Sequence, residues 1–134
     1  MFDYRQFFDL GLNKTVLVRN NSGFSHRGPW AQVSTGNNFD KWFVGEISAA
    51  EYTISIDYNT QNKEILKCLV VATVDKAEVT VYARSSVGRE LVDIEAHVNK
   101  SFVDIFILPK VPQVQSAKFI FTVNYFENQN PLGL

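Results

Sequence analysis

The regular alternation of apolar and polar residues constrains the fold of this chain more than any other feature of its sequence. The run Tyr52–Tyr58 has tyrosine or isoleucine at every second position, with Thr, Ser or Asp between them. Successive side chains of a β-strand point to opposite faces of a sheet, so a period of two indicates a half-buried strand. Similar runs follow at Ala77–Arg84, Leu91–Val98, Phe102–Leu108 and Lys118–Phe126. The pattern therefore predicts an all-β domain.

Further strands are expected from weaker patterns. We predict strands at Thr15–Arg19, Trp30–Val33 and Asp40–Ile47, the last with a bend at Gly45, and we expect connectors at 34–38 and 48–51. The run Glu64–Val74 is apolar on both faces. Such a continuous run is typical of a central strand that is covered on both sides.

The lengths of the connections indicate how the strands are joined. Asp75-Lys76 and Asn99-Lys100 are short enough for tight antiparallel hairpins. Pro109–Ser116 is longer and can cross from one sheet to another. The sequence thus predicts an antiparallel two-sheet β-sandwich of jelly-roll or Ig-like type, with a closed barrel as the alternative.

The chain of 134 residues has the length of one domain with a core of its own. We divide it into an N-terminal arm (1–14), the β-sandwich (15–127) and a C-terminal tail (128–134). Large apolar residues are dense in both end segments, and such residues near a terminus commonly mark interfaces. The predicted interface residues are Phe2, Tyr4, Phe7, Phe8, Leu10, Leu12, Pro131, Leu132 and Leu134. The alternative for the arm is that it folds back over one end of the sandwich.

Charge and composition exclude several classes of partner. The net charge is −1 and basic residues form no run, so nucleic acid is not an expected partner. No stretch approaches the ~18 apolar residues of a membrane span, and no secretory leader is recognised at the start of the sequence. The single cysteine, Cys68, is expected to be a buried reduced thiol in a protein made in the cytoplasm.

The sequence contains few candidates for chemistry, and we predict no catalytic residue, no metal and no cofactor. Asp93, Glu95 and His97 share one face of a predicted strand, which allows a metal site as an alternative, although a solvated strand face is the expected role. Trp30 and Trp42 lie near Asn and Asp residues. If exposed, their indoles could stack on a sugar, so a carbohydrate-binding module for host-surface glycan is the second functional hypothesis.

A resemblance to a known family adds to this reading. The residues that carry it include the segments Trp42–Glu46, Ala50–Ser55, Asn62–Ala72, Leu91–Asp93, Ala96–Ser101, Lys118–Thr122, Tyr125-Phe126 and Asn130–Leu132. Over these segments the chain resembles a module of virion structural proteins from marine tailed phages, particularly those of cyanobacteria. The resemblance covers about two-thirds of the chain.

The resemblance implies a non-enzymatic building block of a phage particle. Its expected place is the tail, neck, baseplate or fibre attachment, with decoration of the capsid as an alternative. Its expected partners are other virion proteins and copies of itself, and it would be assembled in the host cytoplasm. The family supplies no catalytic residues to carry over.

Overall fold

The computed structural model describes residues 16–20, 23–28, 31–34 and 36–129 of the chain, and for 16–20 and 23–27 it describes the backbone alone. This part of the chain contains ten strands and one short 3-10 helix. The elements in chain order are β1 (Val16–Asn20), β2 (Gly23–Arg27), β3 (Ala31–Gln32), β4 (Asn37–Phe43), β5 (Ile47–Asp57), β6 (Lys63–Ala72), β7 (Ala77–Val87), β8 (Val92–Asn99), β9 (Phe102–Pro109), η1 (Pro112–Ser116) and β10 (Lys118–Glu127).

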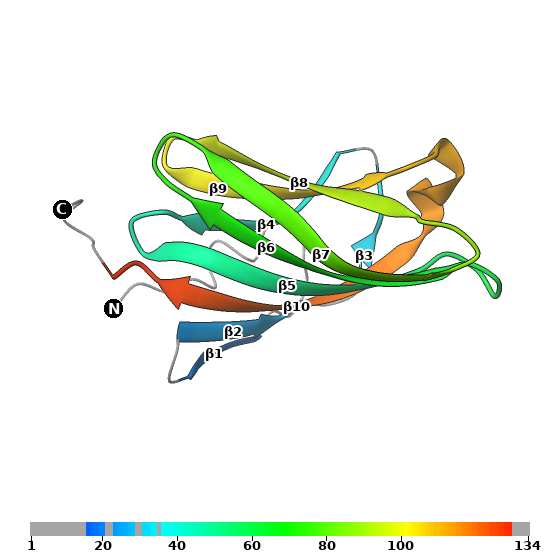
Figure 1. Ribbon diagram of the computed structural model, residues 1–134, viewed down its shortest axis with the longest axis horizontal. Coiled ribbons are helices and arrows are strands. Elements are labelled where there is room, and N and C mark those ends of the chain that lie inside the picture. The colour runs from blue at the N-terminus through cyan, green and yellow to red at the C-terminus, as the bar shows by residue number, and fades with distance from the viewer. Residues whose placement is uncertain (1–15, 21–22, 29–30, 35, 130–134) are drawn as a thin grey trace.

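The strands form two antiparallel sheets that pack face to face (Figure 1). The large sheet has the order β1-β2-β10-β5-β6-β7, with β3 also paired to β10, and the small sheet has the order β4-β9-β8. The predicted two-sheet β-sandwich is therefore confirmed, and the closed barrel is not observed among the described strands. Strand β10 lies between β2 and β5, so the last described strand is central in the large sheet.

Several consecutive strands of one sheet are joined as hairpins, and the crossings between the sheets range from the short turn at 44–46 to the longer segment that holds η1. Strands β5, β6 and β7 form a meander, and β8 and β9 form a hairpin. The segment that holds η1 connects β9 of the small sheet to β10 of the large sheet, as the length and prolines of Pro109–Ser116 predict.

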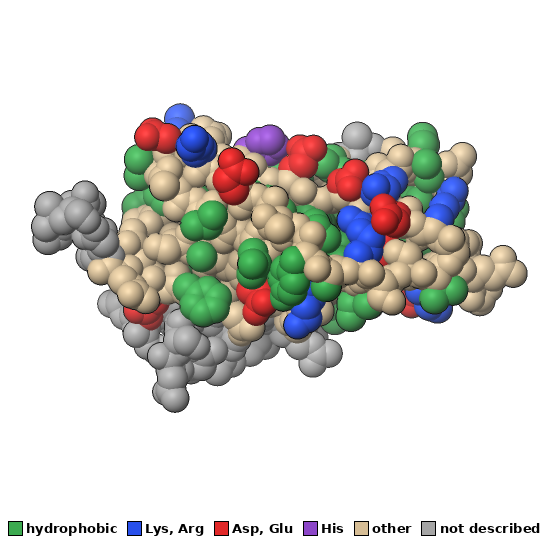
Figure 2. All heavy atoms as spheres, in the orientation of Figure 1, with side chains coloured by type: hydrophobic (Ala, Val, Ile, Leu, Met, Phe, Trp, Pro, Cys, Tyr) green, Lys and Arg blue, Asp and Glu red, His purple; other side chains and the backbone are tan. Residues whose placement is uncertain are grey.

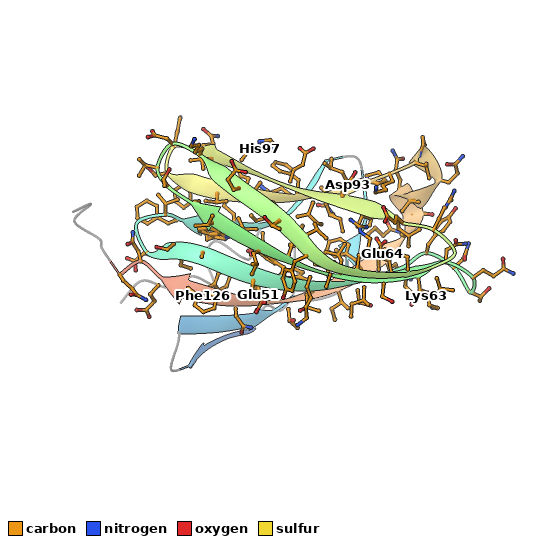
Figure 3. All side chains as sticks on the ribbon, in the orientation of Figure 1. Glu51, Lys63, Glu64, Asp93, His97 and Phe126 are labelled. Carbon is orange, nitrogen blue, oxygen red and sulfur yellow. The ribbon has the colours of Figure 1, made fainter. Side chains whose placement is uncertain are left out.

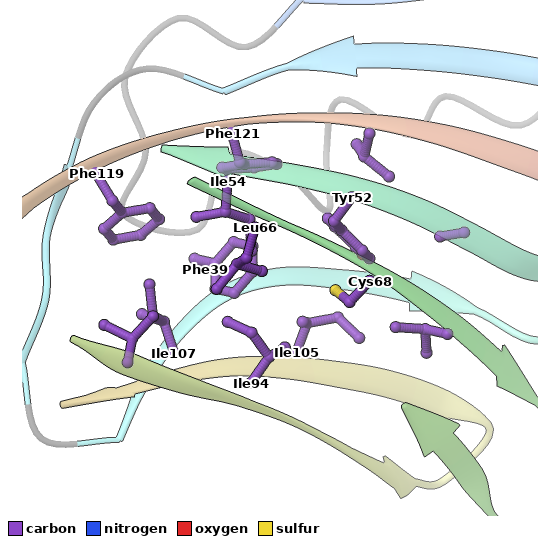
Figure 4. Packing of buried hydrophobic residues seen from close by; sticks show 14 of the residues in the cluster. Phe39, Tyr52, Ile54, Leu66, Cys68, Ile94, Ile105, Ile107, Phe119 and Phe121 are labelled. Atoms are coloured by element: carbon purple, nitrogen blue, oxygen red, sulfur yellow. The ribbon is translucent and has the colours of Figure 1, made fainter. Parts of the chain in front are cut away.

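The core lies between the sheets and is built from the inward residues of the alternating strands (Figure 4). Phe39 of β4 meets two phenylalanines of β10 edge-on, with ring centroids 5.4 Å from Phe119 and 4.9 Å from Phe121. Such edge-to-face contacts add roughly 0.5–1.5 kcal/mol to the burial of the rings. These contacts join the two sheets at the middle of the sandwich.

The prediction that the Glu64–Val74 segment is covered on both sides is wrong. In β6, buried and exposed residues alternate from Lys63 to Val71. Leu66, Cys68 and Val70 are buried, whereas Ile65, Leu69 and Val71 are 47%, 47% and 55% exposed. The strand is central in its sheet as expected, but only its inner face is covered, because a two-layer sandwich covers one face of each sheet.

The predicted boundaries between β4 and β5 are also corrected. The expected strand Asp40–Ile47 is interrupted by a turn at 44–46, and the expected connector 48–51 belongs to β5. In this turn the Glu46 amide donates to the Phe43 carbonyl at 3.1 Å. A Cβ atom at Gly45 would lie 2.4 Å from the Phe43 ring, so a larger residue where the chain passes between the sheets would have to displace that ring.

The β8–β9 hairpin turns one residue later than predicted. Asn99 pairs with Phe102, and Lys100 and Ser101 form the turn. Both turn residues have positive φ, 53° and 68°, which is the geometry of a type I′ turn. The left-handed region is unfavourable for residues other than glycine and, to a smaller extent, asparagine and aspartate.

Candidate interaction surface

The outer face of the large sheet carries the largest exposed apolar side chains of the described residues. Leu69 and Val71 of β6 lie here, together with Tyr82 of β7 and Phe126 of β10, and they are 47%, 55%, 47% and 39% exposed. We call these four residues the apolar patch. Scattered apolar residues are normal on a protein surface, but adjacent ones on a flat sheet indicate an interaction site.

Strand register brings the four residues together from three strands. Phe126 pairs with Ala49 of β5, and Ala49 pairs with Val71 of β6. Leu69 lies two residues along β6 from Val71, on the same face. Figure 2 shows part of this face, with hydrophobic side chains gathered on the half where β10 ends. The patch is therefore a property of the sheet and not of any single segment.

Tyr82 is held on the patch by a bulge and a hydrogen bond. The register of β6 and β7 shifts between Lys67 and Cys68, which leaves Tyr82 as the extra residue of β7. Its hydroxyl donates to Glu51 of β5 at 2.5 Å, across the intervening strand β6. This hydrogen bond to the carboxylate raises the pKa of Tyr82. The ring is thus oriented over the sheet face, next to Leu69.

Acidic and basic side chains occur in equal number on the outer face as a whole. On the outer face, the described strands β5, β6, β7 and β10 carry three acidic and three basic side chains. These are Glu51, Asp57, Glu78, Lys63, Lys67 and Lys118. Figure 3 places Glu51 and Phe126 toward one end of the sheet and Lys63 toward the other. Ile65 and Val87, toward the Lys63 end, are also 47% and 65% exposed, so apolar and charged side chains are mixed along the whole face.

A hollow of about 610 Å³ opens at the opposite end of β5 and β10. Its lining combines hydroxyl groups, one carboxylate, one ammonium group and apolar side chains, supplied by Ser55, Asp57, Tyr58, Ser116, Lys118, Phe119 and Ile120. Asp57 forms an ion pair with Lys63, and the Arg89 guanidinium lies 5.9 Å from the Tyr58 ring centroid. A hollow of this size and polarity can hold a small hydroxylated ligand.

Among the residues that the structure describes, two acidic residues are buried, Asp40 and Glu64. Asp40 of β4 accepts hydrogen bonds from the hydroxyls of Tyr52 at 2.5 Å and Tyr125 at 2.7 Å, and from the Lys41 amide at 2.9 Å. Burial raises the pKa of Asp40 to about 7, although these donors oppose the shift. The hydroxyls come from β5 and β10, so Asp40 connects the small sheet to the large one.

Glu64 holds a second buried cluster. Its carboxylate forms an ion pair with Arg84 at 2.9 Å and accepts hydrogen bonds from Ser86 and from the amides of Leu91 and Val92. The Arg84 guanidinium also donates to the Val92 carbonyl at 3.0 Å. The Glu64 side chain is fully buried. The cluster fixes the crossing from β7 to β8, and no part of the sequence pattern signals it.

The sequence candidates for chemistry lie apart from the patch. Asp93, Glu95 and His97 are exposed along β8, where His97 Nε2 lies 3.1 Å from Glu95, and Asp93 lies 3.5 Å from the Lys110 ammonium (Figure 3). Among the residues that the structure describes, no group of three His, Cys, Asp or Glu side chains is placed to hold a metal ion. The three side chains lie on an exposed face of β8.

The hypothesis that Trp30 and Trp42 bind a sugar is wrong for Trp42. Trp42 has no exposed surface, and its indole NH donates to the Tyr52 hydroxyl at 3.0 Å. It therefore cannot stack on a sugar from solvent. Trp30 lies outside the described residues, as do the nine predicted interface residues of the two end segments. Within the described part of the chain, no helix is long and apolar enough to cross a membrane.

Comparison with known proteins gives a weak structural likeness. No family model matches the chain, and no curated protein matches it. Among solved structures, the chain is similar to the tailspike protein of the Acinetobacter phage vB_ApiP_P1, with 13% sequence identity and a TM-score of 0.39. The match covers 86% of this chain and 21% of the tailspike chain. A likeness at this level leaves the function to be inferred from the residues of this chain itself.

Proposed function

We propose that this protein is a non-enzymatic structural subunit of a phage particle, which holds its neighbours through the outer face of the large sheet and through its terminal segments. The observation that carries the proposal is the apolar patch. Four large side chains, each about half exposed, lie side by side on a hydrogen-bonded sheet. The sequence resemblance to virion structural proteins supports the phage particle as the setting.

The patch is large enough to contribute to stable association. Complete burial of one such side chain is worth roughly 1.5–3 kcal/mol relative to full exposure. Burying four half-exposed side chains would therefore contribute on the order of 3–6 kcal/mol, before the entropy cost of association. Aromatic anchors such as Tyr82 and Phe126 are the residue types that commonly dominate interface energies. The rest of the free energy of association must come from further contacts, and we propose that the terminal segments provide them.

The buried acidic groups support a structural role. A carboxylate that takes part in catalysis needs access to a substrate, but Asp40 and Glu64 are 4% and 3% exposed. Each of them holds groups from several strands in place. We propose that the protein belongs to the tail, neck, baseplate or fibre attachment, with decoration of the capsid as the alternative position.

The proposal is tested in the particles of the phage that encodes this chain. Mass spectrometry of purified particles should detect the protein in several copies, and labelled antibody should locate it by electron microscopy. A phage that carries Leu69→Lys should yield incomplete particles or particles without the protein. His97→Lys, on β8 of the small sheet, is the matched control, because His97 is exposed, lies off this face and is also replaced by one lysine. Purified particles that lack the protein would contradict the proposal.

A second candidate function is supported by the hollow between β5 and β10. Its hydroxyl, carboxylate and ammonium groups could bind the hydroxyls of a saccharide, with Ile120 and Tyr58 against the apolar side of the sugar ring. A glycan array should then give a signal that Asp57→Asn removes and Asp93→Asn, on exposed β8, preserves. The absence of any glycan signal from the folded protein would remove this candidate.

A further inference from the structure

We infer that the free edge of strand β7 binds an extended segment of a second copy of this chain, and that this segment is Phe2–Leu12 of the N-terminal arm. The inference rests on the proposed function, in which the terminal segments hold neighbouring subunits, and it names the place where the arm binds. The segment would add a strand to the large sheet of its neighbour, through main-chain hydrogen bonds to β7 and apolar side chains turned toward the core.

Strand β7 is the last strand of the large sheet, and it pairs with β6 on one side. Among the described residues, no backbone hydrogen bond outside this ladder involves Ala77–Val87. The N–H and C=O groups on the free side of an edge strand can pair with another chain. The register with β6 is regular over Ala77–Val81, before the bulge at Tyr82. A stretch of this length is common for a strand.

The regular part of β7 has few of the features that usually protect a sheet edge, such as lysine, proline, bulges and short strands. Its side chains are Ala, Glu, Val, Thr and Val, with a single charge. By contrast, edge strand β4 of the small sheet has a bulge and Lys41, and edge strand β8 carries Asp93, Glu95 and His97. Residues that favour strands, with little charge and no proline, promote pairing with a further strand.

The inner side chains beside this edge are incompletely covered. Val79 and Val81 of β7 pack against the core and are half-buried, and so are Ala96 and Val98 of β8. Strand β8 is the strand of the small sheet that contacts β7. An added strand with apolar side chains on its inner face would therefore cover apolar surface of both sheets.

Strand register places the two pairs of half-buried residues at the same level of the sandwich. Val81 lies in one cross-strand row with Tyr52, through β6. Val98 lies in one row with Trp42, through β9. The Trp42 indole NH donates to the Tyr52 hydroxyl at 3.0 Å, so the two rows face each other. The edges of the two sheets thus form one apolar strip at this level.

The segment Phe2–Leu12 has the sequence pattern that this strip requires. Five of its six even-numbered positions are apolar, and three of its five odd-numbered positions are charged. A period of two indicates a strand with one apolar face. The segment has 11 residues, as does β7. Its apolar face can cover the strip while its charged face stays in water.

The topology favours the arm of a second copy over the arm of the same chain. Strands β1 and β7 lie at opposite edges of the large sheet (Figure 1), five strand spacings or ~24 Å apart along the sheet. From Leu12 to Val16, where β1 begins, an extended chain spans at most ~14 Å. The connection is therefore too short to cross its own sheet to β7.

The first test is the mass of the purified full-length chain, measured by light scattering over a range of concentrations. The wild type should associate and should dissociate on dilution. Leu10→Asp would place a charge on the apolar face of the arm and should raise the dissociation constant more than tenfold. Gly11→Asp adds the same charge on the other face and should leave it within about threefold. A wild type that stays monomeric, or a Leu10→Asp chain of wild-type affinity, would overturn the inference.

A second test locates the binding site on β7. Cys68 is the chain's one cysteine and is buried, and burial raises the pKa of its thiol to about 12, so an introduced thiol should react alone. Under mild oxidation, a mixture of Leu10→Cys and Val79→Cys chains should form a covalent mixed dimer. Lys63→Cys replaces Val79→Cys in the control mixture, because Lys63 is exposed at the far end of β6. Circular dichroism should show that all three variants keep the fold. Equal rates in the two mixtures would show that the arm does not bind at β7.

A double variant distinguishes a second copy from the same chain. A chain that carries both Leu10→Cys and Val79→Cys should cross-link into species heavier than one chain. If its disulfide closes within one chain instead, the arm binds its own β7 and the inference is wrong.

The two proposals fail in different ways. If the protein is found in phage particles but the Leu10→Cys and Val79→Cys chains do not cross-link, the particle role stands and the binding of the arm at β7 is wrong. If the arm binds β7 of a second copy but the protein is absent from particles, the arm exchange stands and the particle role is lost.

Discussion

The hydroxyl of Tyr125 donates a hydrogen bond of 2.7 Å to the carboxylate of Asp40, and the two residues lie 85 positions apart in the chain. Tyr125 belongs to β10 in the large sheet and Asp40 to β4 in the small sheet. Tyr52 of β5 donates to the same carboxylate at 2.5 Å. This buried contact connects the last described strand to an early one, so the two sheets depend on each other. Because its acceptor, Asp40, can bind a proton, the stability of the fold depends on pH.

Stability should decrease as the pH rises from about 4 to about 7. Burial raises the pKa of Asp40 from 3.8 to about 7, so in this range the folded protein holds a proton that the unfolded chain has released. Unfolding then releases a proton, and the free energy of unfolding falls with pH. The folded-state pKa lies about three above the unfolded value, which corresponds to a loss of at most ~4 kcal/mol. Urea unfolding at pH 5 and pH 7.5 measures the change.

Asp40→Asn is the control for this pH effect, because it removes the titrating group and keeps a similar shape. The variant should show a flatter dependence of unfolding free energy on pH between 5 and 7.5. If the unfolding free energy of Asp40→Asn depends on pH as that of the wild type does, groups other than Asp40 cause the effect.

Replacing Glu64 should destabilise the fold strongly. Glu64→Ala would leave the Arg84 guanidinium, which is 17% exposed, without its buried ion-pair partner and with only the exposed Glu90 at 3.9 Å. It would also leave the amides of Leu91 and Val92 without their acceptor. Breaking a buried ion pair from one side commonly costs about 3–5 kcal/mol. Chemical denaturation gives the value, and Lys63→Ala is the comparison, because the Lys63–Asp57 pair is exposed and should contribute ~0–1 kcal/mol.

Optimising the turn between β8 and β9 should stabilise the protein. Lys100 and Ser101 both have positive φ, and neither residue type favours it. Asn-Gly is the preferred pair for a type I′ turn. The double variant Lys100→Asn with Ser101→Gly should raise the unfolding free energy by about 1 kcal/mol, which is visible as a higher melting temperature. The reversed pair, Lys100→Gly with Ser101→Asn, tests the positional preference and should stabilise less.

Deletion of Met1–Leu12 should leave a folded sandwich that no longer assembles. Every strand of the described core lies after this segment, and we propose that its apolar residues bind neighbouring subunits. Circular dichroism should give the full-length spectrum, while incorporation into particles should be lost. A deletion variant that unfolds would instead place the arm in the core of its own subunit.

The sequence alone predicts much of the fold and little of the interaction surface. The period of two identifies the strands, because burial on one face of a sheet imposes it on the residues themselves. The same local signal fails to predict which faces of β6 are covered, because Leu69 and Val71 are residue types common in cores and yet lie exposed. Apolar composition shows that a residue can be buried, but only the number of layers in the fold decides which faces are covered.

The sequence by itself determined the all-β class, the hairpins of the middle strands and the crossing before β10, since these depend on local patterns and on connection lengths. Only the tertiary structure decided that β10 lies between β2 and β5, that Asp40 and Glu64 are buried, and that the apolar patch faces outward. Strand pairing and the covering of a face arise from contacts between distant segments. The pattern of one segment does not name the segment that pairs with it or covers it, so these contacts appear only when the chain is folded.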